Sequence, residues 1–273
     1  MSAILSIARL EVLIARRNMW VATSVLLMAL FSAVLTLAGA GTGANLAASP
    51  LEVAVSSITT LSVYLVPLVG LLLSFDAISG EIERGTLALS LSYPLSRGEI
   101  LIGKFLAHFT VLAFAVAVGL GLTGVLAIWQ NGGPEMSFAP LWRLFATSLA
   151  LGSAFLGLGY LVSSLVRAPG VASGLAIVIW LVAVVLYDLG LLGALVADGG
   201  GTFTKEIFPW LLVANPADAF RLLNMPQAAT AELASGLSAA GAVSGPAGQL
   251  ASLLLWPLLA MLLAWAAFRK VEP

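Results

Sequence analysis

The sequence contains no cysteine and only one histidine, His108. Without cysteine the chain forms no disulfide and offers no thiolate as a metal ligand or nucleophile. A copper or zinc relay across a membrane needs clustered imidazole or sulfur ligands, and the six methionines are scattered between Met1 and Met261. We therefore expect no metal site and no catalytic site in this chain, and we interpret His108 as an interfacial residue.

Charged residues are also scarce. They make up 9% of the 273 residues, whereas a soluble domain carries about 25%. Hydrophobic residues make up 60% of the chain. This composition excludes an ordinary water-soluble globule and predicts an all-α membrane protein. The formal net charge of −1 provides no general attraction to nucleic acid.

Six apolar runs are each long enough, at about twenty residues, to cross a membrane as a helix. They lie at 19–39, 57–75, 105–129, 143–165, 170–190 and 248–268. The first spans about 30 Å as a helix, so we expect it to stay as a span rather than to be removed as a signal peptide. Before it, residues 1–18 place apolar side chains at helical spacing, which predicts an amphipathic elbow helix on the inner membrane surface: Ile4, Ile7, Leu10 and Leu13.

Lysine and arginine are unevenly distributed between the segments that join these spans. With the N-terminus inside, nine fall on the cytoplasmic side and three on the outer side. The nine are Arg9, Arg16, Arg17, Arg84, Arg97, Lys104, Arg167, Arg269 and Lys270, and the three are Arg143, Lys205 and Arg221. The positive-inside rule therefore predicts that both termini are cytoplasmic.

Two segments match nucleotide-binding patterns without the context that those patterns require. Residues 119–124 (GLGLTG) fit G-x-G-x-x-G, but they lie inside a span with no preceding strand, so close helix packing through small residues explains them better. Residues 98–104 (GEILIGK) resemble a P-loop, but Phe105 stands where serine or threonine coordinates magnesium. We predict that this chain does not hydrolyse ATP. Paired groups for an intramembrane hydrolase are absent too, since Asp188 has no catalytic partner in the sequence.

The stretch from Phe75 to Phe105 concentrates charge between the second and third spans. A charge at the centre of a bilayer costs about 2.5 kcal/mol or more, so this stretch lies in water or against a partner protein. Residues 76–91 predict one helix, which Gly85 weakens or bends. Pro94 closes it, and Ser96 with Glu99 forms a capping box for the next helix. Two short helices joined at Pro94 would form a rigid lever.

The outer segment 191–247 is the longest segment between spans. Within it, Asn215 predicts a helix cap, with Pro216 at the first helical position and Asp218 in the first turn. We interpret this helix as interfacial or re-entrant and packed on the bundle, and also as a docking platform for a periplasmic partner. Its predicted contact residues are Asn215, Asp218, Phe220 and Arg221.

The sequence GEIERGTLALSLSYPLSRGEILIGKF (residues 80–105) resembles the signature of ABC-2-type transporter permeases. The resemblance implies a homodimeric permease of the bacterial inner membrane, made of residues 1–273 as one domain, with residues 76–104 as its cytoplasmic coupling region. It implies that this region docks on a separate ABC ATPase subunit, which binds ATP and magnesium, so the permease itself needs no cofactor. The residues expected to carry coupling are Asp76, Glu81, Glu83, Arg84, Gly85, Thr86, Pro94 and Arg97.

Two stretches, residues 74–94 and NPADAFRLL (215–223), resemble the branch of this family associated with copper-centre maturation of nitrous oxide reductase. There the partners are a cytoplasmic ATPase and a periplasmic accessory protein. We therefore expect this chain to couple ATP hydrolysis by its partner to transport, or to mechanical work on a periplasmic protein. The alternatives are an ABC-2 exporter of a lipid, peptide or other small substrate, and a non-enzymatic membrane scaffold.

Overall fold

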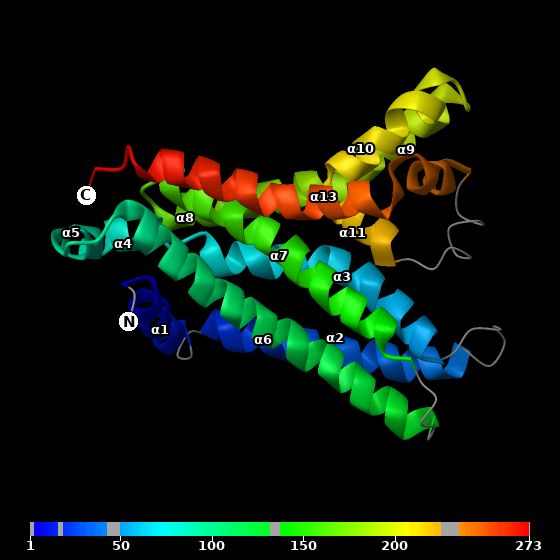
Figure 1. The fold of residues 1–273 in the computed structure, drawn as a ribbon, viewed down its shortest axis with the longest axis horizontal. Helices are drawn as coiled ribbons and strands as arrows, with labels where there is room; N and C mark the ends of the chain where they lie inside the picture. Colours follow the sequence, from blue (N-terminus) through cyan, green and yellow to red (C-terminus); the bar gives the residue numbers. More distant parts are fainter. Residues whose placement is uncertain (1–2, 16–18, 43–49, 132–136, 225–234, 273) are drawn as a thin grey trace.

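The computed structural model describes residues 3–15, 19–42, 50–131, 137–224 and 235–272. These residues form a bundle of helices and contain no strand. The helices run roughly along one axis, and α4, α5 and both chain termini lie at the same end (Figure 1). We call this end the α4–α5 end. Arg16 and Arg17 of the expected elbow, and parts of the expected outer segments, lie outside the described residues.

Five helical stretches are long and apolar enough to cross a membrane. They are Val55–Glu83, Arg97–Trp129, Ala139–Leu165, Pro169–Asp198 and Gly245–Phe268. The helix expected first, α2 (Met19–Thr42), adds a shorter apolar stretch, Val25–Leu37. The chain is therefore an all-helical, multi-pass membrane protein, as the composition predicts.

The helices extend beyond most of the predicted spans. They are α3 (Pro50–Ser74), α6 (Arg97–Asn131), α7 (Ala139–Leu165), α8 (Pro169–Trp180) with η2 (Leu181–Leu186) and α9 (Tyr187–Asp198), and α13 (Ser235–Phe268). At 35 residues, α6 is roughly 50 Å long, well beyond the ~30 Å of a hydrocarbon core. The capped helix after Pro94 and the third span are thus one continuous helix.

Helix α7 lies at the centre, with α3 and α13 packed along it, while α2 packs along α6. The α3–α7 contact depends on Gly70, where an added Cβ would lie 2.9 Å from the backbone oxygen of Gly152. At Gly119 of α6 an added Cβ would lie 3.1 Å from Ser32 Oγ and 3.2 Å from the Met28 oxygen, both of α2. The interpretation of G-x-G-x-x-G as close helix packing is confirmed at this glycine.

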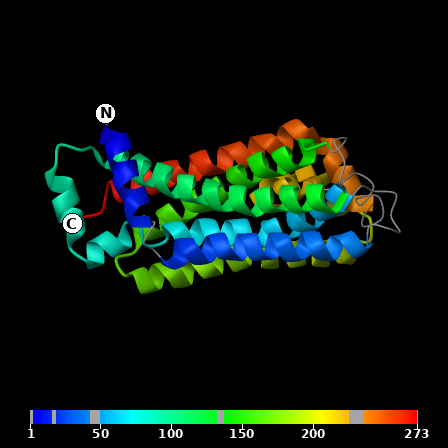
Figure 2. The ribbon, with the colours of Figure 1, turned by 90° about the horizontal axis from the view of Figure 1, so that it is seen from below.

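Helix α1 (Ala3–Ala15) lies across the ends of the long helices rather than along them (Figure 2). Its Ile7 packs on α6, where a Cβ at Gly103 would lie 2.8 Å from Ile7 Cβ. Leu10, Leu13 and Ile14 are at least half exposed. The apolar face expected from the sequence is therefore divided: Ile7 contacts the bundle, whereas Leu10 and Leu13 face outward.

Candidate coupling site

The charged stretch after α3 folds into two short helices rather than one. Helix α4 (Ser79–Glu83) ends before Gly85, and α5 (Thr86–Ser92) follows. Gly85 has φ +68°, a left-handed conformation that residues with a Cβ rarely adopt. The expected single helix over 76–91 is therefore broken at Gly85, because this glycine turns the chain instead of merely bending it.

The next helix begins with the expected capping box. The Ser96 backbone N–H donates to Glu99 Oε2 at 2.8 Å, and the Glu99 N–H donates back to Ser96 Oγ at 3.2 Å. Pro94 precedes it as an exposed residue in the connection between α5 and α6. This cap starts α6 at Arg97 and so sets where the connection ends.

A buried serine of α7 holds the start of α4. Ser163 Oγ accepts hydrogen bonds from the backbone N–H groups of Ile78 and Ser79, at 2.9 and 3.0 Å. Ser163 and Ser79 are fully buried. The N–H groups at a helix start have no partner within the helix, so a side chain that accepts two of them fixes that end in place. Ser163 thus connects the charged stretch to the central helix.

A buried lysine joins three helices at the same end. Lys104 Nζ of α6 lies 2.9 Å from Glu11 Oε1 of α1 and 2.9 Å from Glu81 Oε1 of α4. The exposed side-chain fractions are 5% for Lys104, 18% for Glu11 and 15% for Glu81. A buried cation between two carboxylates resists separation of the helices that carry them, because each charge left alone would lose its partner.

Two further contacts extend this network. His108, one turn along α6 from Lys104, lies with Nδ1 2.7 Å from the hydroxyl of the fully buried Tyr160. His108 is itself buried within the bundle, and its position at the membrane interface stays a prediction. At the start of α6, Arg97 Nη1 donates to the backbone oxygens of Phe268 and Val271. The end of α13 is therefore attached to the charged stretch.

The expected coupling residues divide into an outward and an inward group. The outward group is exposed and consists of Glu83, Arg84, Gly85, Thr86 and Pro94. Asp76, Glu81 and Arg97 are partly buried, and Glu81 and Arg97 are engaged within the chain. The contact of Glu81 with an ATPase stays a prediction, but its carboxylate already has a partner in Lys104.

Sequence reasoning missed two large exposed side chains on this surface. Leu89 of α5 is 62% exposed and Tyr93 is 61% exposed. Exposed large apolar side chains beyond the ends of the apolar spans are typical of surfaces that bind another protein. The available signal was spacing: Leu89 lies two positions from Leu87 and so on the other side of a helix, where Leu87 is buried and Leu89 is exposed.

At the opposite end, α11 (Pro216–Asn224) begins as expected. Asn215 Oδ1 accepts the Ala217 N–H at 2.9 Å, which confirms the cap. Asn215 Nδ2 donates to the Ala183 oxygen at 2.7 Å, within the π-helical segment η2. Asn215, Asp218 and Phe220 are all buried. Their role as contacts for a periplasmic partner stays untested, but in this conformation their side chains face the bundle.

Arg221 joins two acidic residues beside that cap. Its Nη2 donates to Asp188 Oδ2 at 2.7 Å and its Nη1 to Asp218 Oδ1 at 2.9 Å. Asp218 is buried, whereas Asp188 keeps 26% of its side-chain surface exposed. Helix α11 lies outside the five long apolar stretches. Burial, and then the nearby Asp188 charge, raise the pKa of Asp218 to about 8, against the lowering effect of Arg221.

Among the residues described, no three histidine, cysteine, aspartate or glutamate side chains are grouped to hold a metal ion. Asp188 and Asp218 share an arginine, whose positive charge opposes a cation there. The chemistry that these clusters support is therefore attachment of helices to one another by charge and hydrogen bonds.

The described helices form a multi-pass bundle with a charged, partly exposed segment between the second and third long helices. The model of the ABC-2 family transporter proteins matches residues 5–272, and the chain belongs to this family. It is thus the permease subunit of an ABC transporter, a class of membrane subunit that is generally not enzymatic.

Two curated relatives support the same assignment. The chain is 38% identical over 274 aligned positions to the "Probable ABC transporter permease protein NosY" of Stutzerimonas stutzeri, and the alignment covers 99% of each protein. It is 38% identical, over the same share of each protein, to the protein of that name from Pseudomonas aeruginosa. The resemblance stated from residues 80–105 is therefore confirmed over the whole chain.

Proposed function

We propose that this chain converts ATP hydrolysis by a separate cytoplasmic ATPase into movement of its own helices, and that residues 76–104 receive that movement. The observation that carries the proposal is the two-sided nature of α4 and α5. Their inner side is fixed to α7 by Ser163 and to α1 and α6 by Lys104. Their outer side exposes Leu89 and Tyr93. A segment with this arrangement transmits a push to the bundle.

The charge count supports placing the α4–α5 end in the cytoplasm. Of the described lysines and arginines, the α4–α5 end carries Arg9, Arg84, Arg97, Lys104, Arg167, Arg269 and Lys270. With both termini at that end (Figure 1), the chain would have cytoplasmic termini in the bacterial inner membrane.

The test is co-purification of the ATPase with variants of the outer surface. Glu83→Lys and Leu89→Asp should each weaken ATPase association and lower transport-coupled ATP hydrolysis, because both change exposed positions without touching the inner contacts. Glu206→Lys, an exposed acidic residue at the opposite end, is the matched control and should leave ATPase association unchanged. Unaltered association in both Glu83→Lys and Leu89→Asp would refute the proposal. Glu81→Lys is unsuitable, since it would place two lysines together in a buried site.

We also propose that the work is done on a periplasmic protein held by residues 191–247, in copper-site assembly of nitrous oxide reductase. Because Asp218 and Phe220 are buried, the contact surface would be the exposed part of η3 (Phe203–Ile207) and α10 (Phe208–Ala214), including Lys205, Glu206 and Trp210. ATP-dependent copper uptake into proteoliposomes that hold only this permease and its ATPase would refute the mechanical role and favour direct transport.

A second copy of the chain completes the proposal. Two of the five long apolar stretches, Pro169–Asp198 and Gly245–Phe268, are the least buried. Only 17% of the apolar segment of each is buried inside the chain. On the first of these stretches, a Cβ added at Gly170 or Gly174 would meet no atom within 4 Å. Small residues let helices of two chains approach closely, so we expect α8 to contact the second permease.

A further inference from the structure

A cavity of about 490 Å³ opens at the α4–α5 end, between the last turns of α7 and α13 and the short helix α4. Its volume falls within the range of about 300–1,000 Å³ typical of small-molecule sites. The apolar spans end here, at Leu165 and Phe268. The cavity therefore lies at the boundary between the hydrocarbon core and water. One part of its lining belongs to the spans, and the other part follows their ends.

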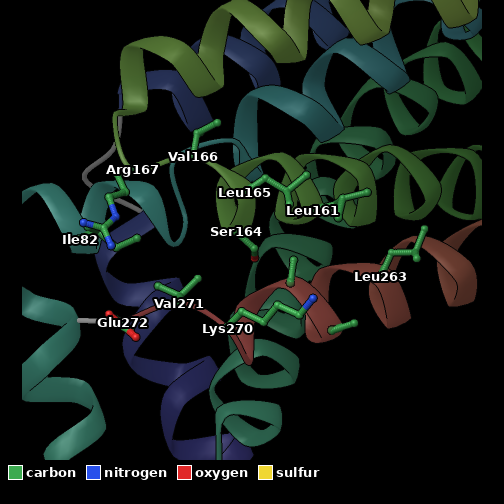
Figure 3. Close-up of a pocket in the computed structure, with 12 residues that line it drawn as sticks. Ile82, Leu161, Ser164, Leu165, Val166, Arg167, Leu263, Lys270, Val271 and Glu272 are labelled. Atoms are coloured by element: carbon green, nitrogen blue, oxygen red, sulfur yellow. The ribbon is translucent and has the colours of Figure 1, made fainter.

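The apolar part of the cavity is made by leucines of the two spans. Leu161, Leu165 and Leu263 line it and lie together at one side (Figure 3). Leu165 is 66% exposed and Leu263 is 47% exposed, so this part opens to the surrounding membrane. From Leu161 to Leu165 the helix rises about 6 Å, enough to contact several methylene groups of an extended chain.

The charged part of the cavity lies beyond the ends of the spans. Arg167 follows α7 and Lys270 follows α13, and both line the cavity together with Glu272. Figure 3 shows Arg167 beside Ile82 of α4 on one wall, with Lys270 on the wall opposite. The lining carries two cationic side chains and one carboxylate, so its net charge favours an anion. Arg97 shapes this wall, because it holds the backbone of Phe268 and Val271 in place.

We propose that this cavity binds an anionic phospholipid of the adjoining leaflet. Its phosphate lies between Arg167 and Lys270, and one acyl chain lies along Leu161, Leu165 and Leu263. The cationic rim lies next to a membrane-facing apolar wall. This arrangement favours a phospholipid over free phosphate, because inorganic phosphate has no apolar part that could contact the leucines. It also favours lipid over a protein segment, since the leucine wall lies within the spans. Through Ile82 the bound lipid would touch α4, the helix that Lys104 and Ser163 hold.

The test is titration of the full-length purified chain with phosphatidylglycerol, with retained lipid counted by native mass spectrometry. Arg167→Gln and Lys270→Gln should each weaken binding about fivefold, because one cation near a lipid surface contributes about 1 kcal/mol. Glu272→Gln should strengthen binding. Ala266→Phe, which fills the apolar lining without a change of charge, should also weaken it.

Arg269→Gln is the matched control. Arg269 lies next to Lys270 in the chain, but its guanidinium lies 4.8 Å from the centre of the Trp265 ring and it does not line the cavity. It should therefore leave lipid binding unchanged. All these positions except Ala266 carry exposed charged side chains, and equal unfolding midpoints would show that each variant is folded.

Three results would overturn the proposal. Equal losses in Arg269→Gln and Lys270→Gln would show general attraction of lipid to charge. Displacement of phosphatidylglycerol by millimolar inorganic phosphate would show a free-anion site instead of a lipid site. Loss of ATPase association in Arg167→Gln and Lys270→Gln, with lipid retention unchanged, would show that the cavity is a protein contact; the Glu83 and Leu89 variants test that contact separately.

Discussion

Replacing Lys104 by methionine should destabilise the folded chain strongly. Methionine is unbranched and apolar and one heavy atom shorter than lysine, so the change removes mainly the ammonium group and its charge. In Lys104→Met the carboxylates of Glu11 and Glu81, both drawn to within 2.9 Å of the same nitrogen, would lose their common partner and repel each other. The variant therefore isolates the contribution of the cation that joins α1, α4 and α6.

The expected size of the effect follows from the burial of the three groups. Removing one partner of a buried ion pair costs about 3–5 kcal/mol, because a charge is left in the interior without compensation. Glu11 and Glu81 keep 18% and 15% of their side-chain surface exposed, so water compensates part of that loss. We therefore expect the low end, about 3 kcal/mol, which is more than a hundredfold in the folding equilibrium.

The assay is reversible unfolding of the purified chain in mixed micelles, followed by circular dichroism. Glu81→Gln introduced into Lys104→Met should recover about 1–2 kcal/mol, since it removes one of the two uncompensated carboxylates. Lys205→Met, an exposed lysine at the opposite end, should change stability by less than about 0.5 kcal/mol. A loss below about 1 kcal/mol in Lys104→Met, or additive effects of Lys104→Met and Glu81→Gln, would refute the reasoning.

Three other substitutions test separate parts of the structure. Ser163→Ala leaves two buried N–H groups without an acceptor and should cost about 2 kcal/mol with faster hydrogen exchange at α4, whereas Ser173→Ala, at a partly exposed serine that bonds within its own helix, should not. The pKa of Asp218 is about 8 in the folded chain, against an ordinary value of 3.8, so the free energy of unfolding should fall as pH rises from about 4 to 8. Asp218→Asn should remove this pH dependence, and an unchanged pH profile in that variant would contradict the prediction. Gly174→Leu should weaken self-association measured by cross-linking, while Gly121→Leu, equally open within the chain, should not.

Features that depend on neighbours in sequence were predictable. The capping box of Ser96 and Glu99 and the cap at Asn215 involve residues up to three positions apart, and each forms as expected. The long apolar helices follow from composition alone, because hydrocarbon requires about twenty apolar residues for each crossing. Gly85 was recognised as a weak point, but its left-handed φ depends on how α4 and α5 are each held.

Contacts between distant helices were not predictable. Ser163 lies 84 and 85 positions from its two donors, and Lys104 lies 93 positions from Glu11. Hydropathy predicts which segments enter the membrane, but not how each helix is rotated about its axis. The burial of Asp218 and Phe220 was missed for this reason. The charged residues of α11 indicate an exposed face in the sequence, whereas in the structure Arg221 pairs with Asp188 of another helix and with Asp218.

Helix α7 is the element that both candidate sites share. At one end its Ser163 holds the start of α4, and toward the other its Thr147 accepts a hydrogen bond from Asn224 of α11 at 2.8 Å. These two positions are sixteen residues apart on one helix, a rise of about 24 Å. Close packing of α3 and α13 along α7 resists bending between them. Under the proposed function, displacement of α4 would therefore move α7 as a rigid rod and carry α11 with it, which is the mechanical route that the proposal requires.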